Sequence, residues 1–301
     1  MIKNSIKFSV NSFLSKFNLK IVNLSSVKPY NIIDKDINPL SAQYHAGNKK
    51  ILTNINLSDC RTNRWFSMSN NTLDPAIFAV RESLKKNLNS NDLYENILSL
   101  LNENLSLGLP KNAAEHLGIE PDLNGKIHTY PWWAAVNPWD NLTFDDQLKI
   151  YPIEVKKNRA NNGMQIVSDD SNEIVRDDIE NSLPSHVNQY KKLIELIKEN
   201  GFKQGDKFGY VNAELFIANN KFCWKIGDEG NHRATVAAAL GMTKIPVLIT
   251  KIIRLDEIDY WPNVINGTFK KDQAIKIFYN IFDAKPSKIY GQWIKRKVQH
   301  L

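Results

Sequence analysis

Cysteine is scarce in this sequence, where Cys60 and Cys223 are the only two among 301 residues. Two isolated cysteines supply neither a disulfide framework nor the paired spacing of a zinc site. The sequence also lacks an apolar run long enough to cross a bilayer. Residues 1–25 contain neither the continuous apolar stretch nor the small-residue cleavage site of a secretory signal. These absences predict a cytoplasmic protein.

Charge of one sign is not in large excess either. Thirty-nine Lys and Arg residues stand against 32 Asp and Glu, which gives a net charge of +7 and a pI of about 9.1. The hydrophobic content of 42% and charged content of 24% are those of an ordinary globular protein. A mild basic excess is as typical of a solvated surface as of attraction to phosphate-bearing partners. Charge therefore does not predict a nucleic-acid partner.

The chain divides into four expected parts. Residues 1–120 show mainly helical patterns, residues 121–164 form a Pro- and Trp-rich connecting arm, residues 165–255 alternate between helix and strand, and residues 256–301 form a helical extension. This order predicts an α/β (α+β) protein whose N-terminal part is mainly helical.

Several helix boundaries are marked by capping residues. Asp74 followed by Pro75 predicts an N-cap and a first helical turn, and residues 112–119 predict a short helix that ends at Gly118. Residues 1–20 mix apolar side chains with lysines in an amphipathic pattern. Such a segment is either a helix in peripheral contact with a membrane surface or, as we favour, a first helix docked on the core.

The connecting arm has an unusual density of tryptophan. Trp132, Trp133 and Trp139 lie close together, and the prolines among them predict that no long helix crosses this part of the chain. We favour packing as the role of these side chains, because tryptophan buries a large area. The alternative is a stacking surface in which Trp132 and Trp133 bind a sugar or base. The polar stretch that follows, with Lys156, Lys157 and Arg159, reads as a loop.

Residues 165–255 carry the clearest pattern. A helix is expected from residue 185 to a stop at Gly201, followed by two strands joined at residues 218–221. A second helix should then run from Asn231 to about Leu240, before a β-branched strand at residues 244–253. Between the second strand and the second helix lies the stretch "GDEGNHR", residues 227–233, which we call the junction.

The junction combines features of a phosphate site. Gly227 and Gly230 let the backbone turn sharply, the following helix offers unpaired N–H groups, and His232 and Arg233 add donors suited to phosphate. In the alternative interpretation the helix is simply capped, with Asn231 and Asp228 satisfying its N–H groups.

The stretch "GDEGNHRATVAAALGMTKIPVLI" resembles the ParB/sulfiredoxin-like superfamily, in which a Gly-x-x-Arg or Asp-Gly-x-His-Arg signature opens a helix followed by "LG" and "IPV". The resemblance covers about residues 165–255. It implies nucleotide binding, with Gly230, Asn231, His232 and Arg233 holding the phosphates of ATP or ADP, or of CTP as in partition proteins. The chain as a whole also resembles uncharacterised proteins of bacterial surface-polysaccharide gene clusters, through "PWWAAVNPWD", the Asn-His-Arg triplet and "WPNV".

This chain departs from the superfamily pattern in three ways. Glu229 inserts an extra acid between Asp228 and Gly230, the junction contains no cysteine for the sulfiredoxin reaction, and no helix-turn-helix pattern follows as it does in partition proteins.

Two classes of function remain open. The first is a nucleotide-dependent phosphotransferase, of kinase type, acting on a small hydroxylated acceptor such as a sugar or glycan of surface-polysaccharide biosynthesis. It needs a phosphate cradle, Mg²⁺ and a carboxylate to deprotonate the acceptor. The second is a nucleotide- or DNA-binding regulator without chemistry. We expect Asp228, Glu229 and His232 to be catalytic. Further carboxylate candidates precede the expected helix, namely Asp169, Asp170, Glu173, Asp177 and Asp178.

Overall fold

The computed structural model describes residues 28–33, 35, 37–47, 49–69, 71–120, 125–161, 170–205 and 209–299. The chain forms two compact units, Met1–Thr53 and Asn54–Leu301. The amphipathic segment at residues 1–20 lies outside the described residues, so its expected helix stays a prediction. Within the described ranges, every helix is too short or too polar to cross a bilayer.

The first unit contains a small parallel strand pair. Strand β1 (Tyr30–Asn31) pairs with β2 (Ile51–Asn56), which continues into the second unit. Helix α2 (Pro39–Ala46) lies between them in sequence. Asn38 is its N-cap, and the Asn38 side chain accepts a hydrogen bond from the N–H of Leu40. A proline in the first turn supports this start, because its missing N–H has no helical partner in any case.

The second unit contains a mixed sheet with neighbours in the order β6-β4-β5-β3. The expected hairpin is confirmed: β4 (Asn212–Ala218) runs antiparallel to β5 (Lys221–Ile226). Asn219 and Asn220 turn the chain with φ of 50° and 60°, a left-handed pair that matches the twist of the strands. Strand β6 (Lys244–Arg254) is parallel to β4, and β3 (Cys60–Arg61) is parallel to β5.

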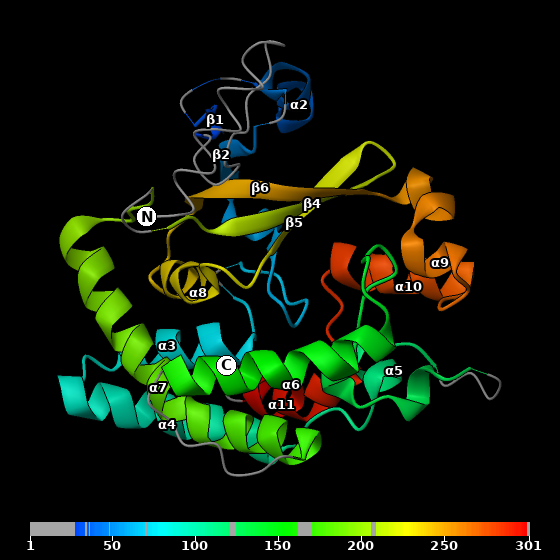
Figure 1. Cartoon of the computed structure of the whole chain (residues 1–301). Helices are drawn as coiled ribbons and strands as arrows, with labels where there is room; N and C mark the ends of the chain where they lie inside the picture. The colour runs from blue at the N-terminus through cyan, green and yellow to red at the C-terminus, as the bar shows by residue number, and fades with distance from the viewer. Residues whose placement is uncertain are drawn as a thin grey trace, which may run out of the picture. The chain divides into compact units, whose positions relative to one another are not determined.

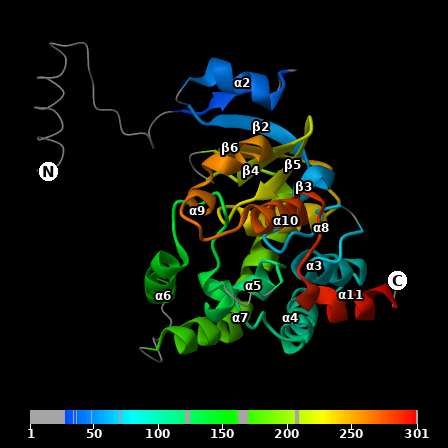
Figure 2. The ribbon, with the colours of Figure 1, turned by 90° about the vertical axis from the view of Figure 1, so that its right-hand side faces the viewer.

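Helices of the second unit cover one face of these strands (Figures 1 and 2). Helices α8 (Asn231–Ala239) and α10 (Lys271–Phe282) lie next to the strands. Farther from the sheet lie α3 (Pro75–Lys85), α4 (Ser90–Ser106), α5 (Ala113–His116), α6 (Phe144–Asn161), α7 (Ser171–Asn200) and α11 (Gly291–Val298). The connections include α9 (Pro262–Ile265) and 3-10 turns at Leu57–Asp59, Ile127–Thr129, Trp132–Ala134, Leu255–Tyr260 and Lys288–Tyr290. The expected α/β class is thus confirmed, while residues 28–120 carry strands as well as helices.

Local capping signals were reliable guides to helix ends. The Asp74 carboxylate accepts hydrogen bonds from the N–H groups of Ala76 and Ile77 and so starts α3. Gly201, with φ of 71°, ends α7 and donates its N–H to the carbonyl of Ile197. A glycine in this left-handed region costs no steric strain, which is why it stops helices well.

Two expectations about the middle of the chain were wrong. Residues 155–161, the first part of the polar stretch with Lys156 and Arg159, are helical as part of α6, although Pro152 lies inside that helix. Thr143 and Asp146 exchange hydrogen bonds and fix the first turn of α6. Contacts farther along the helix, such as Tyr151 stacked on Trp133 at 5.9 Å, offset the hydrogen bond that the proline removes. Helix α7 likewise begins at Ser171 rather than near residue 185, and it contains Pro184.

The "PWWAAVNPWD" and "WPNV" segments meet in the core. Trp139 is 5% exposed and packs edge-to-face on Trp261, with ring centres 5.1 Å apart. Asn263 is fully buried, and its side-chain amide donates to main-chain carbonyls of Asn137, Asp140 and Leu142. The packing interpretation of Trp139 is confirmed, and both segments support the face of the sheet that carries α10.

Candidate functional site

The junction lies between β5 and α8, and Gly230 shapes it. This glycine has φ of 81°, and a Cβ added there would lie 2.7 Å from the Cα of Val211. A side chain is therefore excluded both by conformation and by the neighbouring backbone. Helix α8 begins at Asn231, as expected, but no side-chain hydrogen bond caps it. The capped-helix interpretation is therefore wrong for the side chains of Asn231 and Asp228, although the main-chain carbonyl of Asp228 accepts the N–H of Asn231 at 3.4 Å.

Two asparagines from other parts of the second unit hold the acids of the junction. The Asn63 amide donates to the Asp228 carboxylate at 2.9 Å, and the Asn212 amide donates to the Glu229 carboxylate at 2.6 Å. The main chain of Asn212 also bonds to Glu229 and Gly227. Each carboxylate is thus oriented by an amide, which is a neutral donor. These two hydrogen bonds therefore do not neutralise the negative charges of Asp228 and Glu229.

A histidine pair joins the junction to α7. His186 Nδ1 and His232 Nε2 are 2.9 Å apart, and the rings stack at 5.0 Å with an angle of 20° between their planes. The Tyr190 ring packs beside His232 at 5.2 Å. Burial, followed by the neighbouring His186 and Arg64, lowers the pKa of His232 to about 4. Burial also lowers the pKa of His186. His232 is therefore uncharged at neutral pH and can offer a phosphate only a neutral hydrogen bond.

Arg233 lies in the first turn of α8 and is the cation of the junction. Its Nη1 donates to the carbonyl of Gly209 at 3.2 Å. Burial lowers the pKa of Arg233, but an arginine remains charged at neutral pH because its ordinary value is so high. The guanidinium keeps further N–H groups beyond this one bond, and these can meet an anion at the start of the helix.

The turn at residues 62–66 brings a second arginine to this region. Arg64 Nη1 is 3.6 Å from the carboxylate of Asp74, which is 1% exposed, whereas the Arg64 side chain is 39% exposed. Arg64 is close enough to lower the pKa of both His186 and His232. The next residue, Trp65, has φ of 68°, an unfavourable conformation for a large side chain that the surrounding packing holds in place.

The two tryptophans proposed for acceptor binding differ in exposure. Trp133 is 7% exposed, stacks on Tyr151 and donates its ring N–H to Asn172. It therefore has no free face for a ligand. Trp132 is only partly buried, and its ring lies 5.9 Å from that of His116, which in turn neighbours Trp65 at 6.3 Å. Of the two, Trp132 alone keeps surface for stacking.

Two of the acidic residues before and within α7, Asp170 and Asp178, make contacts with other parts of the protein. Asp170 caps the helix by accepting from the N–H groups of Asn172 and Glu173. Asp178 lies 4.0 Å from Arg159, and Glu173 is exposed. Asp169 and the side chain of Asp177 lie outside the described residues. Asp170 is thus explained by helix capping, while Asp228 and Glu229 remain the acids placed next to α8.

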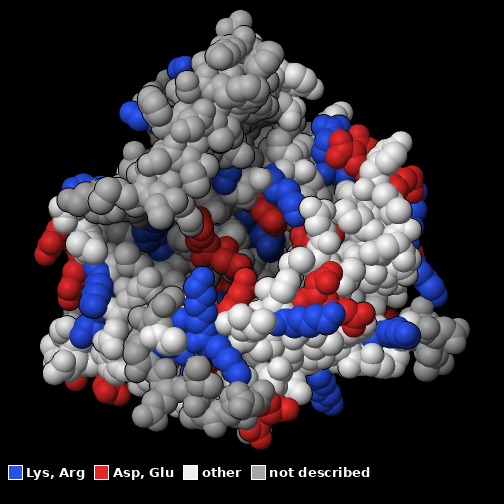
Figure 3. Space-filling view, in the orientation of Figure 1, with Lys and Arg blue, Asp and Glu red and all other residues white. Residues whose placement is uncertain are grey.

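The front of the second unit is hollowed near its centre, and acidic and basic side chains both line the hollow (Figure 3). Sequence reasoning missed the residues that complete the junction, namely Asn63, Arg64, His186, Tyr190 and Asn212. His186 and Tyr190 are four positions apart on α7 and so share a helical face, which is a signal that the sequence did contain. No spacing links Asn63 or Arg64 to the junction.

Within the described ranges, no cluster of three or more His, Cys, Asp or Glu side chains could hold a metal ion. Mg²⁺ usually needs only one or two carboxylates together with the phosphates of its nucleotide, and the junction contains that number in Asp228 and Glu229. Compared with known proteins, the chain matches no protein-family model, no curated protein and no solved structure.

Proposed function

We propose that this protein is a nucleotide-dependent phosphotransferase that binds nucleotide phosphates at the junction and transfers a phosphoryl group to a small hydroxylated acceptor. The observation that carries the proposal is the uncapped start of α8 at Gly230, with Arg233 in the first turn. Backbone N–H groups at such a helix start, together with the helix dipole, favour a bound anion. The resemblance to the ParB/sulfiredoxin-like superfamily supports ATP or ADP as the nucleotide, with CTP as a further candidate.

Gly230 and His232 supply backbone donors for the phosphates in this proposal, and Arg233 supplies the charge. The N–H of Asn231 joins them only if it leaves the Asp228 carbonyl, to which it donates at 3.4 Å. Gly230 allows the tight turn before α8, because the Val211 main chain occupies the place of a Cβ. His232 adds a neutral donor or acceptor, in keeping with its lowered pKa. Arg64 adds positive potential from the side of Asp74. The cradle thus combines one direct cation with fixed dipoles, the arrangement that phosphoryl transfer requires.

The two acids of the junction supply the remaining roles. Asp228 and Glu229 would hold Mg²⁺, which shields phosphate charge when bound. One of the two carboxylates also accepts the proton of the acceptor hydroxyl as its oxygen attacks the phosphorus and the shortened nucleotide leaves. Asn63 and Asn212 keep both carboxylates in fixed orientations through their amide donors. Trp132 offers its partly exposed ring to the acceptor, and a sugar or glycan suits such a ring.

Calorimetric titration of ATP, ADP and CTP with Mg²⁺ tests the proposal. Arg233→Ala should weaken binding of the preferred nucleotide by about ten- to a hundredfold, because it removes a charge-assisted contact. Arg296→Ala is the matched control, since Arg296 is half exposed on α11 and pairs with Glu103. Circular dichroism should show both variants folded. The proposal that the junction binds phosphate would be wrong if the wild-type protein bound none of the three nucleotides. It would also be wrong if wild type and Arg233→Ala bound with equal affinity.

A measurement of nucleotide turnover distinguishes the proposed enzyme from a protein that only binds nucleotide. With a bound nucleotide and candidate sugars, nucleotide consumption should depend on the sugar and should fall in Asp228→Asn or Glu229→Gln by a larger factor than nucleotide binding does. Nucleotide binding with no turnover under any of these conditions would instead support the non-catalytic nucleotide- or DNA-binding regulator.

A further inference from the structure

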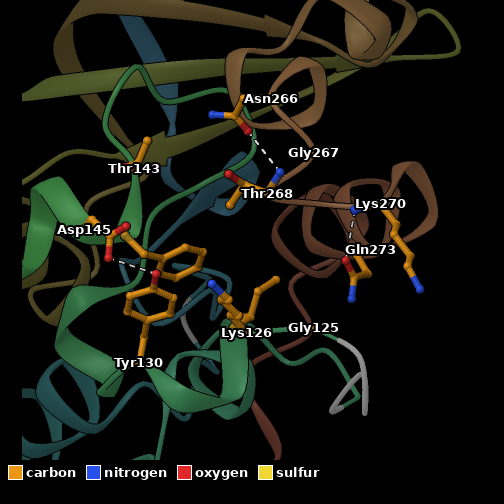
Figure 4. A pocket seen from close by; sticks show the side chains of 12 residues that line it. Gly125, Lys126, Tyr130, Thr143, Asp145, Asn266, Gly267, Thr268, Lys270 and Gln273 are labelled. Carbon is orange, nitrogen blue, oxygen red and sulfur yellow. Dashed lines mark hydrogen bonds between the residues drawn. The ribbon is translucent and has the colours of Figure 1, made fainter.

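A separate cavity of about 510 Å³ lies within the second unit, between the turn at Ile127–Thr129, the start of α6 and the segment that leads into α10 (Figure 4). It shares no residue with the junction. Its polar lining includes Lys126, Tyr130, Thr143, Asp145, Thr268 and Gln273. A volume of this size suits a ligand of one or two sugar rings, within the range of roughly 300–1,000 Å³ found for small-molecule sites.

One wall of the cavity is held rigidly by the start of α6. The Tyr130 hydroxyl donates to Asp145 Oδ1 at 2.9 Å. The Tyr130 ring stacks on Phe144 at 4.8 Å with an angle of 18°, and Phe144 is only 2% exposed. Thr143 is fixed in turn by its hydrogen bonds with Asp146. Tyr130 and Asp145 therefore present a fixed ring and a fixed carboxylate, which is the rigidity that a binding site needs.

The facing wall supplies donors. Gln273 accepts the N–H of Lys270 through its side-chain oxygen at 3.0 Å, so its NH₂ group stays available as a donor. Thr268 is placed by a hydrogen bond from its main chain to Asn266 at 3.0 Å. Figure 4 shows Tyr130, Asp145 and Lys126 on one side and Gln273 on the other. Donors and acceptors at opposite walls are what a ligand with several hydroxyl groups requires.

The charges of the cavity favour a single negative charge on the ligand. Lys126 and Asp145 place one cation and one acid at the cavity, and Lys270, which also lines it, has an interaction of its own. Within the described part of the chain, the Lys126 ammonium makes no hydrogen bond or ion pair. A phosphate dianion would face the Asp145 carboxylate at close range, which disfavours it, whereas a monoanion can meet Lys126 alone.

We propose that this cavity binds a monoanionic sugar, such as a uronic acid. The carboxylate of the sugar meets Lys126, its hydroxyl groups meet Asp145, Gln273 and Thr268, and its apolar ring face rests on Tyr130. This proposal does not depend on nucleotide binding at the junction.

Titration calorimetry with glucuronic acid and glucose into the full chain tests this site. Glucuronic acid should bind more tightly than glucose. Lys126→Gln should lower the affinity for glucuronic acid by at least about tenfold, because a charge-assisted contact is lost, while glucose binding is unchanged. Tyr130→Ala should weaken both sugars. Lys111→Gln, at an exposed lysine elsewhere on the surface, is the matched control and should bind like wild type.

Circular dichroism establishes that each variant is folded. Arg233→Ala should bind glucuronic acid like wild type, which separates failure of this site from failure of the nucleotide site. Absence of saturable glucuronic acid binding, equal affinity for glucose and glucuronic acid, or wild-type affinity in Lys126→Gln would each overturn the proposal.

Discussion

His186 and His232 form a stacked, hydrogen-bonded pair in which Nδ1 of one ring lies 2.9 Å from Nε2 of the other. One nitrogen must donate and the other accept, so the contact exists only while at least one ring is neutral. Protonation of both rings would turn two N–H donors toward each other. The contact between α7 and the first turn of α8 therefore depends on the protonation state of these two histidines. The pair lies beside the proposed phosphate site.

Removal of His186 should raise the pKa of His232. Burial, then His186 and then Arg64 depress this pKa to about 4, so His186→Phe removes one of these causes while preserving a ring of similar size. An NMR titration of the His232 ring in wild type and variant measures the change. An unchanged midpoint would show that His186 has no electrostatic influence on His232.

Stability should decrease as the pH falls from about 6.5 toward about 4. Burial and then Lys225 lower the pKa of His116 to about 4, and His232 has a similar value. An unfolded chain has histidine pKa values near 6.5, so in this window it binds protons that the folded chain does not. Each histidine contributes a slope of at most about 1.4 kcal/mol per pH unit. Urea unfolding at several pH values should show a smaller slope in His116→Gln than in wild type, and identical slopes would contradict the prediction.

Gly230→Ala should destabilise the protein far more than Gly241→Ala. The two glycines have nearly the same φ, 81° and 79°, so both substitutions strain the backbone by roughly 1–2 kcal/mol. At Gly230 the new Cβ would also collide with the Val211 main chain at 2.7 Å, whereas at Gly241 nothing lies within 4 Å. The collision should add about 1–3 kcal/mol. Chemical denaturation measures both variants, and equal losses would show that Val211 moves aside freely.

Asn263→Leu should cost at least about 2 kcal/mol of unfolding free energy, because the carbonyls of Asn137, Asp140 and Leu142 lose their shared donor. Asn91→Ala, at an exposed position on α4, is the control and should change stability little. Thermal and urea unfolding of the two variants provide the comparison. A neutral Asn263→Leu would mean that water replaces the amide at all three carbonyls.

The sequence by itself determined the features that depend on near neighbours in the chain. The Asp74–Pro75 start of α3, the Asn219–Asn220 hairpin turn, the Gly201 stop and the start of α8 at Asn231 all follow from local backbone preferences and capping. The same local signals failed where distant contacts outweighed them. Pro152 lies inside α6 because Trp133 and the Thr143–Asp146 exchange hold that helix in place.

Only the tertiary structure decided what surrounds the junction. Asn63 reaches Asp228 across a sequence separation of 165 residues, and His186 reaches His232 across 46. Side-chain partners this far apart are chosen by the packing of whole elements, here α7 and the turn at residues 62–66 against α8, and no local pattern encodes them. The sequence therefore specified a strand-to-helix turn rich in polar groups, whereas the fold decided which amides orient its acids and kept His232 uncharged by burying it.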